Sequence, residues 1–275
     1  MRALLPFVLL LAACNGGEVE PQVCDASAPR QTYVISALSF ARRDAGVVDG
    51  FDLDGLDTAQ GDPDGCGHAD LVSPDGVPGI DNNFSALVPI LESTEAVAAE
   101  SLIAQSIASG ELLITLTLGD VDNWVADDCV DLTVGRAEGV PLVGPDGVLL
   151  DHQTLAPHST IASVSTMGAA DDLQITGGDL AFNLPLDVLN AELDFEVSRG
   201  VFQLQKRYDG AITGVMGGMI PIRQIVEILE RDDVNLQSFI PIVQATADVR
   251  GDSGTCDSLS LAFELEALPA WLAEE

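Results

Sequence analysis

The residues with the clearest chemical potential form one acidic stretch, from Asp49 to Asp81. These 33 residues include nine aspartates and no Lys, Arg or Glu. Because like charges a few ångströms apart repel, an ordered loop of this composition needs wide spacing or a bound cation. We expect the cation to be calcium, which prefers carboxylate and carbonyl oxygens. The aspartates are Asp49, Asp52, Asp54, Asp57, Asp62, Asp64, Asp70, Asp75 and Asp81.

The spacing within the acidic stretch favours a metal loop. A DxDG pattern occurs twice, at Asp52–Gly55 and at Asp62–Gly65. Short acidic side chains on a backbone bent at glycine turn several oxygens toward one point. The alternative is a set of solvated turns, since Asp bonds to nearby backbone and Gly tolerates positive φ. The predicted ligands are Asp52, Asp54, Asp57, Asp62, Asp64, Asp81 and Asn82.

The DxDG pattern resembles the Asp-rich calcium loops of EF-hands, dockerins and thrombospondin type 3 repeats. With Gly55 at position 6 of an EF-hand loop, Asp52 and Asp54 occupy positions 3 and 5. Positions 1 and 12 are Gly50 and Gly61, which offer no side-chain ligand. An ordinary EF-hand is therefore excluded, and a non-standard site is expected.

The start of the chain has the pattern of an export signal. Arg2 precedes an apolar run from Leu4 to Leu11, which is too short to span a membrane. The ending Leu-Ala-Ala before Cys14 resembles the lipobox of bacterial lipoproteins, which implies cleavage before Cys14 and its acylation, for example with palmitate. The alternative is an ordinary signal peptide with an incidental cysteine. We expect a signal peptide over residues 1–13 and a lipidated tether over 14–30.

The lipobox resemblance indicates the location of the protein, and its charge limits the partners it can bind. The resemblance implies the bacterial cell envelope, with a lipid anchor in the outer membrane or at the cell surface. Removal of residues 1–13 takes the formal charge from −33 to −34, because Arg2 is lost. A surface this acidic repels phosphate groups, so nucleic acid is excluded as a partner. The expected membrane contact is the lipid anchor, and a protein or glycan ligand is left open.

Four cysteines come after Cys14, and none has the CxxC spacing of a zinc site. Export to an oxidising compartment predicts two disulfides, with three connectivities open. We favour Cys66 with Cys256, because each lies beside a turn that borders the expected core. The four cysteines are Cys24, Cys66, Cys129 and Cys256.

Hydrophobic periodicity predicts a mainly β chain with several helices. A first strand is expected over Gln31–Phe40, and strict alternation from Leu259 to Leu265 is the best strand pattern. Helices are expected near 81–110, with Asp81 as the N-cap and an interruption at Pro89, and near 221–231. Many short strands separated by turns favour a β-sandwich or jelly-roll-like single domain over 31–275.

A longer pattern surrounds the acidic stretch. The segment GFDLDG, then a Cys, then SPDGVPGIDN before a helix is similar to a group of uncharacterised bacterial lipoproteins. This resemblance implies no activity. It implies that Asp52, Asp54, Asp81 and Asn82 form one constellation, with Asp81 brought back to the DxDG turn.

The sequence supports two functional hypotheses. The first is a non-enzymatic, lipid-anchored protein in which calcium stabilises a β-rich binding or envelope-structural domain. The alternative is a secreted-type β-sandwich hydrolase acting on glycans through a carboxylate pair. The hydrolase hypothesis predicts a cleft with aromatic walls and with two carboxylates roughly 5 to 9.5 Å apart.

A four-residue motif and a histidine have structural interpretations that we favour over catalysis or metal binding. The GDSG at Gly251–Gly254 matches the sequence around the nucleophile of trypsin-like proteases, but Thr255 and Cys256 replace that family's next residues, so we interpret the motif as a turn. His68 has no second histidine at ligand spacing, which favours an exposed loop histidine over a metal ligand.

Overall fold

The computed structural model describes residues 24–25, 29–93, 99–125, 127, 129–167, 173–188, 191–231, 237–251 and 253–273. The strands are β1 (Gln31–Phe40), β2 (Leu71–Val72), β3 (Pro78–Ile80), β4 (Leu113–Gly119), β5 (Val130–Glu138), β6 (Gln153–Met167), β7 (Gln174–Val188), β8 (Ala191–Lys206), β9 (Ile212–Pro221), β10 (Val249–Arg250) and β11 (Cys256–Leu272). The α-helices are α1 (Val88–Glu92), α2 (Ala99–Ser109), α3 (Ile222–Arg231) and α4 (Ile240–Gln244), and the 3-10 helices are η1 (Asn83–Ala86) and η3 (Gln237–Phe239).

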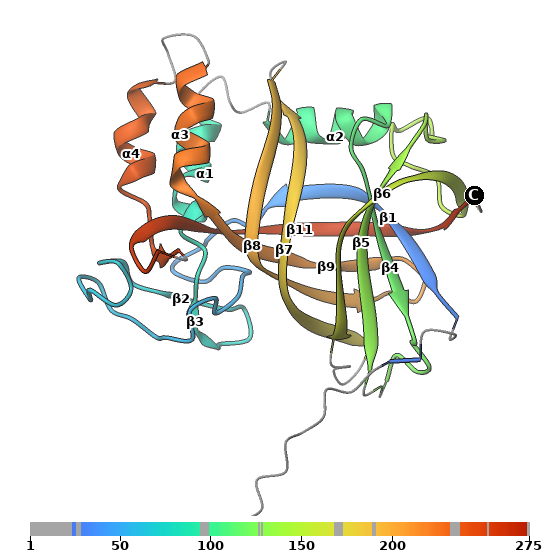
Figure 1. Cartoon of the computed structure of the whole chain (residues 1–275), viewed down its shortest axis with the longest axis horizontal. Helices are drawn as coiled ribbons and strands as arrows, with labels where there is room; N and C mark the ends of the chain where they lie inside the picture. Colours follow the sequence, from blue (N-terminus) through green and yellow to red (C-terminus); the bar gives the residue numbers. More distant parts are fainter. Residues whose placement is uncertain are drawn as a thin grey trace, which may run out of the picture.

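Strand β11 organises the sheet and crosses the middle of Figure 1. It is antiparallel to β1 and to β9, and its end at Ala270–Leu272 runs parallel to β6. Strands β1, β4, β5, β6 and β11 therefore close into a five-stranded ring, and the sheet continues from β11 through β9 and β8 to β7. The mainly β fold with several helices is confirmed.

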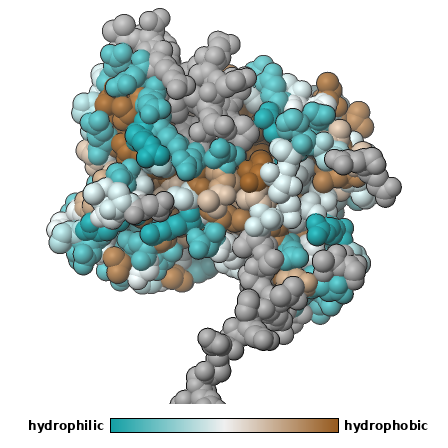
Figure 2. All heavy atoms as spheres, in the orientation of Figure 1, coloured by the Kyte–Doolittle hydropathy of each residue, from teal (hydrophilic) through white to brown (hydrophobic). Residues whose placement is uncertain are grey.

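The alternation in β11 separates the core from the outer face, as predicted. Leu261, Phe263 and Leu265 are buried in the main core, whereas Glu264 and Glu266, on the other face of β11, are exposed. Helix α2 packs against β1, and its Ile103 and Ile107 join the same core. Figure 2 shows one face, where hydrophilic side chains surround smaller apolar areas.

The predicted helical regions are confirmed, but the predicted cap is wrong. Segments η1, α1 and α2 lie within 81–110, and α3 covers the second region. The break between η1 and α1 falls at Leu87. Pro89 lies just after it, in the first turn of α1, where proline is tolerated. The N-cap of η1 is Asn82, whose side chain accepts a hydrogen bond from the Ser85 N–H. Asp81 is instead paired with Phe51 in an isolated β-bridge, which turns its carboxylate away from the helix.

Two disulfides link distant parts of the chain. Cys66 pairs with Cys256, as favoured from the sequence, and Cys24 pairs with Cys129. The second disulfide links Cys24, which belongs to the predicted tether over residues 14–30, to Cys129 directly before β5. Cys14 and the predicted signal peptide lie outside the described residues. Among the helices that the structure describes, none has the length and apolar character needed to cross a membrane.

Candidate metal centre

The acidic stretch packs on the outer face of β9 and β11. Phe51 and Leu53 from its first turn contact Met219 and Val249 in a small apolar cluster. Glycine at 217 makes room for this contact, because a Cβ there would lie 2.7 Å from the Phe51 ring. The close approach of strand and loop therefore explains the glycine at this position.

Two arginines from outside the acidic stretch fix its backbone. Arg199, on β8, donates to the Leu53 carbonyl at 2.8 Å. Arg250, on β10, donates to the Pro63 carbonyl at 2.6 Å and to the Gly254 carbonyl at 3.0 Å. These bonds use carbonyl oxygens and leave the aspartate carboxylates available.

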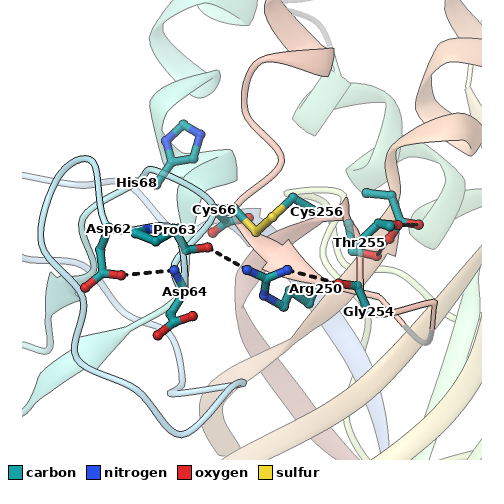
Figure 3. Close-up of a disulfide and its surroundings, with 12 residues drawn as sticks. Asp62, Pro63, Asp64, Cys66, His68, Arg250, Gly254, Thr255 and Cys256 are labelled. Atoms are coloured by element: carbon teal, nitrogen blue, oxygen red, sulfur yellow. Dashed lines mark hydrogen bonds between the residues drawn. A yellow bond between two sulfur atoms is a disulfide. The ribbon is translucent and has the colours of Figure 1, made fainter.

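The Cys66–Cys256 disulfide adds a covalent attachment at the same place (Figure 3). Arg250 lies beside this disulfide and bridges the loop at Pro63 to the turn at Gly254 (Figure 3). The acidic stretch is therefore held on β10 and β11 by a disulfide, a guanidinium and apolar packing.

A hairpin returns the chain to the first DxDG turn. Strands β2 and β3 pair, and the Ser-Pro-Asp-Gly turn between them is closed by a bond from the Gly76 N–H to the Ser73 carbonyl at 2.9 Å. At the end of β3 the Asp81 N–H donates to the Phe51 carbonyl at 2.8 Å. The resemblance-based expectation that Asp81 returns to the DxDG turn matches this arrangement.

The carboxylates of Asp52, Asp54 and Asp81 converge. One oxygen from each lies within 4.8 Å of the others. Because calcium–oxygen distances are about 2.4 Å, oxygens on opposite sides of one ion are separated by up to about 4.8 Å. The spacing of the three carboxylates therefore fits one calcium ion.

Each of these carboxylates accepts one backbone N–H. Asp52 Oδ1 accepts from Gly55 at 2.6 Å, and Asp54 Oδ1 accepts from Leu56 at 2.9 Å. Asp81 Oδ2 accepts from Leu53 at 2.7 Å. No described donor occupies the second oxygen of any of the three. One oxygen of each carboxylate thus holds the turn through a hydrogen bond, and the second oxygen of each is free to bind a cation.

Without a metal, the surroundings of the cluster disfavour the ionised form of its carboxyl groups. Asp81 is only 3% exposed, and burial raises the pKa of its carboxyl to about 8, with smaller contributions from Asp54, Asp248 and Asp70. Burial, together with the charges of Asp70 and Asp52, also raises the pKa of Asp54. A divalent cation at this point would offset both the burial and the repulsion.

The remaining predicted ligands do not join this cluster. Asp57 and Asp64 are exposed, and Asp62 Oδ1 accepts a turn bond from the Asp64 N–H at 3.0 Å. Asn82 uses its side-chain oxygen to cap η1 and donates its amide to the Asp49 carbonyl at 2.8 Å. The second DxDG pattern therefore forms a turn beside the disulfide, whereas the first DxDG pattern contributes to the cluster.

A backbone oxygen lies next to the cluster. A Cβ on Gly79 would be 2.6 Å from the Leu56 carbonyl oxygen and 3.6 Å from Asp52 Oδ2. Both oxygens therefore face Gly79, whose φ of +82° is one that L side chains rarely adopt. Leu56 stands at position 7 of the EF-hand register, which supplies a backbone carbonyl ligand.

A buried polar network below the acidic stretch was missed by sequence reasoning. Asp248 is 6% exposed and accepts hydrogen bonds from the backbone N–H and the hydroxyl of Ser260. His68 acts on Asp248 through its charge, which lowers the pKa of Asp248, and its Nδ1 lies 3.2 Å from the Asn83 side-chain amide. His68 is thus half-buried rather than exposed. Only the long-range fold brings Asp248 and His68 together, so local spacing gave no signal.

The other clusters have structural explanations. The GDSG motif lies at a turn between its described ends, where the Gly254 N–H donates to the Gly251 carbonyl at 2.8 Å. Asp120 lies beside Cys24 and Cys129, but a disulfide uses both sulfurs, which leaves no thiolate for a metal.

A polar groove adjoins the acidic stretch on the sheet, and no aromatic residue is among the described residues that line it. The aromatic walls expected for the glycan hydrolase are therefore missing from this groove, and the hydrolase stays a prediction. Comparisons of the chain with protein-family models, with curated proteins and with solved structures find no match.

Proposed function

We propose that this chain is an exported, lipid-anchored protein of the bacterial cell envelope whose β-rich domain is stabilised by calcium. Asp52, Asp54 and Asp81 hold the ion, and the Leu56 carbonyl, which faces Gly79 as Asp52 Oδ2 does, is a further ligand for the site. The protein acts by binding or by structural support, without catalysis at this site. The convergence of three carboxylates within 4.8 Å is the observation that carries the proposal.

The ion has a structural role because of where its ligands come from. Asp52 and Asp54 belong to the first turn of the acidic stretch, whereas Asp81 lies two residues before the helical segment that starts at Asn83. An ion shared by these residues joins the two ends of the stretch. Loss of the ion leaves like charges beside a buried carboxyl, which weakens docking of the stretch on β9 and β11.

A calcium titration followed by thermal unfolding tests the proposal. For an extracellular-type site with a Kd on the order of 0.1 to 1 mM, a ten-fold excess of calcium adds about 1.4 kcal/mol. The melting temperature then rises by a few degrees relative to chelator. Magnesium, which demands a tighter octahedral site, is expected to give a smaller shift.

Two variants separate the site from general acidity. Asp54→Ala removes a ligand, and Asp64→Ala removes an exposed aspartate outside the cluster. We expect the calcium shift to disappear in Asp54→Ala and to persist in Asp64→Ala. Equal calcium shifts in the two variants, or equal shifts with magnesium and calcium, would show that the acidic stretch is only a set of solvated turns.

The anchor is tested separately from the metal. Cys14, acylated after removal of residues 1–13, places the domain at the membrane, and the two disulfides are consistent with export to an oxidising compartment. In detergent-phase partitioning, wild type is expected in the detergent phase and Cys14→Ser in the aqueous phase. Equal partitioning of the two would refute lipidation.

A further inference from the structure

Two rows of side chains cross the outer face of the sheet next to the acidic stretch. Their alignment follows from the strand register between β7, β8, β9, β11 and β1. Paired strands lie about 4.8 Å apart, so a row over five strands is roughly 19 Å long. The first row is Gln174, Gln205, Thr213, Glu266 and Ala37, and the second is Thr176, Gln203, Val215, Glu264 and Ser39.

All members of these rows except Thr176 line a groove of about 530 Å³. Asp49 and Asp75 of the acidic stretch form part of its wall. Among the described residues that line the groove, every ionisable side chain is an acid, and the others supply amides, hydroxyls and short aliphatic surfaces. The volume is in the range of small-molecule sites.

The acidic end of the groove is electrostatically unsatisfied. Burial, then the charge of Asp75, raises the pKa of Asp49, and burial, then the charge of Asp49, raises the pKa of Glu264. Arg42 lowers the pKa of Glu264, but its guanidinium is paired with Glu92 and Glu100 at 2.8 and 2.7 Å. A ligand with positive charge at this end relieves the repulsion.

We propose that this groove binds a linear polyamine. One ammonium group lies between Asp49 and Glu264, a methylene segment crosses Val215, and a second ammonium donates to the side-chain oxygens of Gln203 and Gln205. Ammonium groups are hydrogen-bond donors only, and the groove offers acceptors at both ends with an aliphatic floor between them. This site is separate from the metal cluster and does not depend on calcium being bound there.

Calorimetric titration with spermidine, in saturating calcium and at physiological salt, tests the proposal. We expect saturable binding of one spermidine per chain. Glu264→Gln should weaken binding about ten-fold or more, because a charge-assisted hydrogen bond is lost. Glu111→Gln removes the same charge at an exposed position outside the groove and should leave the affinity within about two-fold.

A charge-neutral variant separates the groove from the general acidity of the protein. Gln203→Leu preserves the net charge and removes an acceptor from the second row, so it should weaken spermidine binding while Glu111→Gln does not. Thermal melts establish that each variant is folded. The proposal is overturned by non-saturable binding, by equal losses in Glu264→Gln and Glu111→Gln, or by an unchanged affinity in Gln203→Leu.

Discussion

The carboxylate of Asp81 accepts a hydrogen bond from the Leu53 N–H at 2.7 Å, although 28 positions separate the two residues. This bond and the β-bridge between Asp81 and Phe51 close the first DxDG turn against the end of the acidic stretch. Asp81 is almost fully buried, and the charges of Asp54, Asp248 and Asp70 add to the effect of burial in raising its pKa. The structure thus holds a buried carboxyl where a cation would stabilise it.

Asp81→Asn is expected to stabilise the metal-free protein and to abolish its response to calcium. The asparagine oxygen still accepts from the Leu53 N–H, while the new amide can donate to the Asp52 and Asp54 carboxylates. Above about pH 8, where the Asp81 carboxyl is ionised, a repulsive contact therefore becomes an attractive one, worth roughly 1 to 2 kcal/mol. Urea unfolding in chelator and in excess calcium measures both effects.

The matched control for this variant is Asp64→Asn, which also replaces one acid by its amide. It should change the metal-free stability by no more than about 0.5 kcal/mol and retain the calcium response. A calcium response that survives in Asp81→Asn would contradict the assignment of Asp81 as a ligand.

The two disulfides are expected to differ in what their removal exposes. Each closes a long loop, of 190 or 105 positions, so either double Cys→Ser variant should lose roughly 5 kcal/mol in the chain-entropy model. The difference in closure entropy between them is only about 0.5 kcal/mol. However, only removal of Cys66–Cys256 breaks the covalent link between the acidic stretch and β11.

Limited proteolysis in calcium distinguishes the two variants. Early cleavage within 49–81 is expected when Cys66 and Cys256 are replaced by serine. The variant with Cys24 and Cys129 replaced should keep this stretch protected and keep its calcium shift. Equal protection of the stretch in both variants would show that Arg250 and the apolar contacts alone hold it.

The parts of the fold that local patterns encode were predictable. The alternation from Leu259 to Leu265 predicts the strand β11, although Ser260 and Ala262 on its outer face are buried too. The pairing of Cys66 with Cys256 was favoured because both flank turns beside the core. The ring closure between β1 and β11 was not predictable, because the paired residues are more than 200 positions apart and no local pattern specifies such a register.

The candidate site was predictable only in part. Asp52, Asp54 and Asp81 were named from the DxDG pattern and a resemblance, and they converge. Asp62 and Asp64 share the same pattern, but their turn lies beside the disulfide, so the pattern alone did not discriminate. Arg199 and Arg250 reach the stretch from other strands, which its own composition could not reveal.

Gly217→Ala should loosen the acidic stretch. The added Cβ would lie 2.7 Å from the Phe51 ring and 3.0 Å from the Leu261 carbonyl oxygen. Overpacking of this kind costs about 1 to 3 kcal/mol. Gly119→Ala is the control, because its Cβ would meet only ordinary contacts, the nearest at 3.5 Å.

The role of the Phe51 ring is checked by a double-mutant cycle measured in urea. Phe51→Leu should cost less in the Gly217→Ala background than in wild type, because the smaller side chain relieves the clash. Additive losses would mean that Gly217 is required for a reason other than the Phe51 contact.

Metal-free protein should lose stability between about pH 4 and pH 6 through Asp248. Burial raises the pKa of its carboxyl from 3.8 to about 6, while the hydrogen bonds from Ser260 and the charge of His68 oppose the shift. Asp81 is the acid that faces it from the end of β3. A raised carboxyl pKa means that the folded state binds the proton more tightly, so its stabilising effect is complete below 3.8 and is lost as pH rises through about 6. The full change is up to about 3 kcal/mol.

Asp248→Asn isolates this contribution to the pH dependence. The asparagine keeps an acceptor for the Ser260 N–H and does not titrate, so the proton-linked stabilisation at low pH is absent from the variant. Urea unfolding of the metal-free proteins from pH 4 to pH 7 should therefore show a flatter stability profile for Asp248→Asn than for wild type. Identical slopes in the two proteins would show that other carboxyls carry the pH dependence.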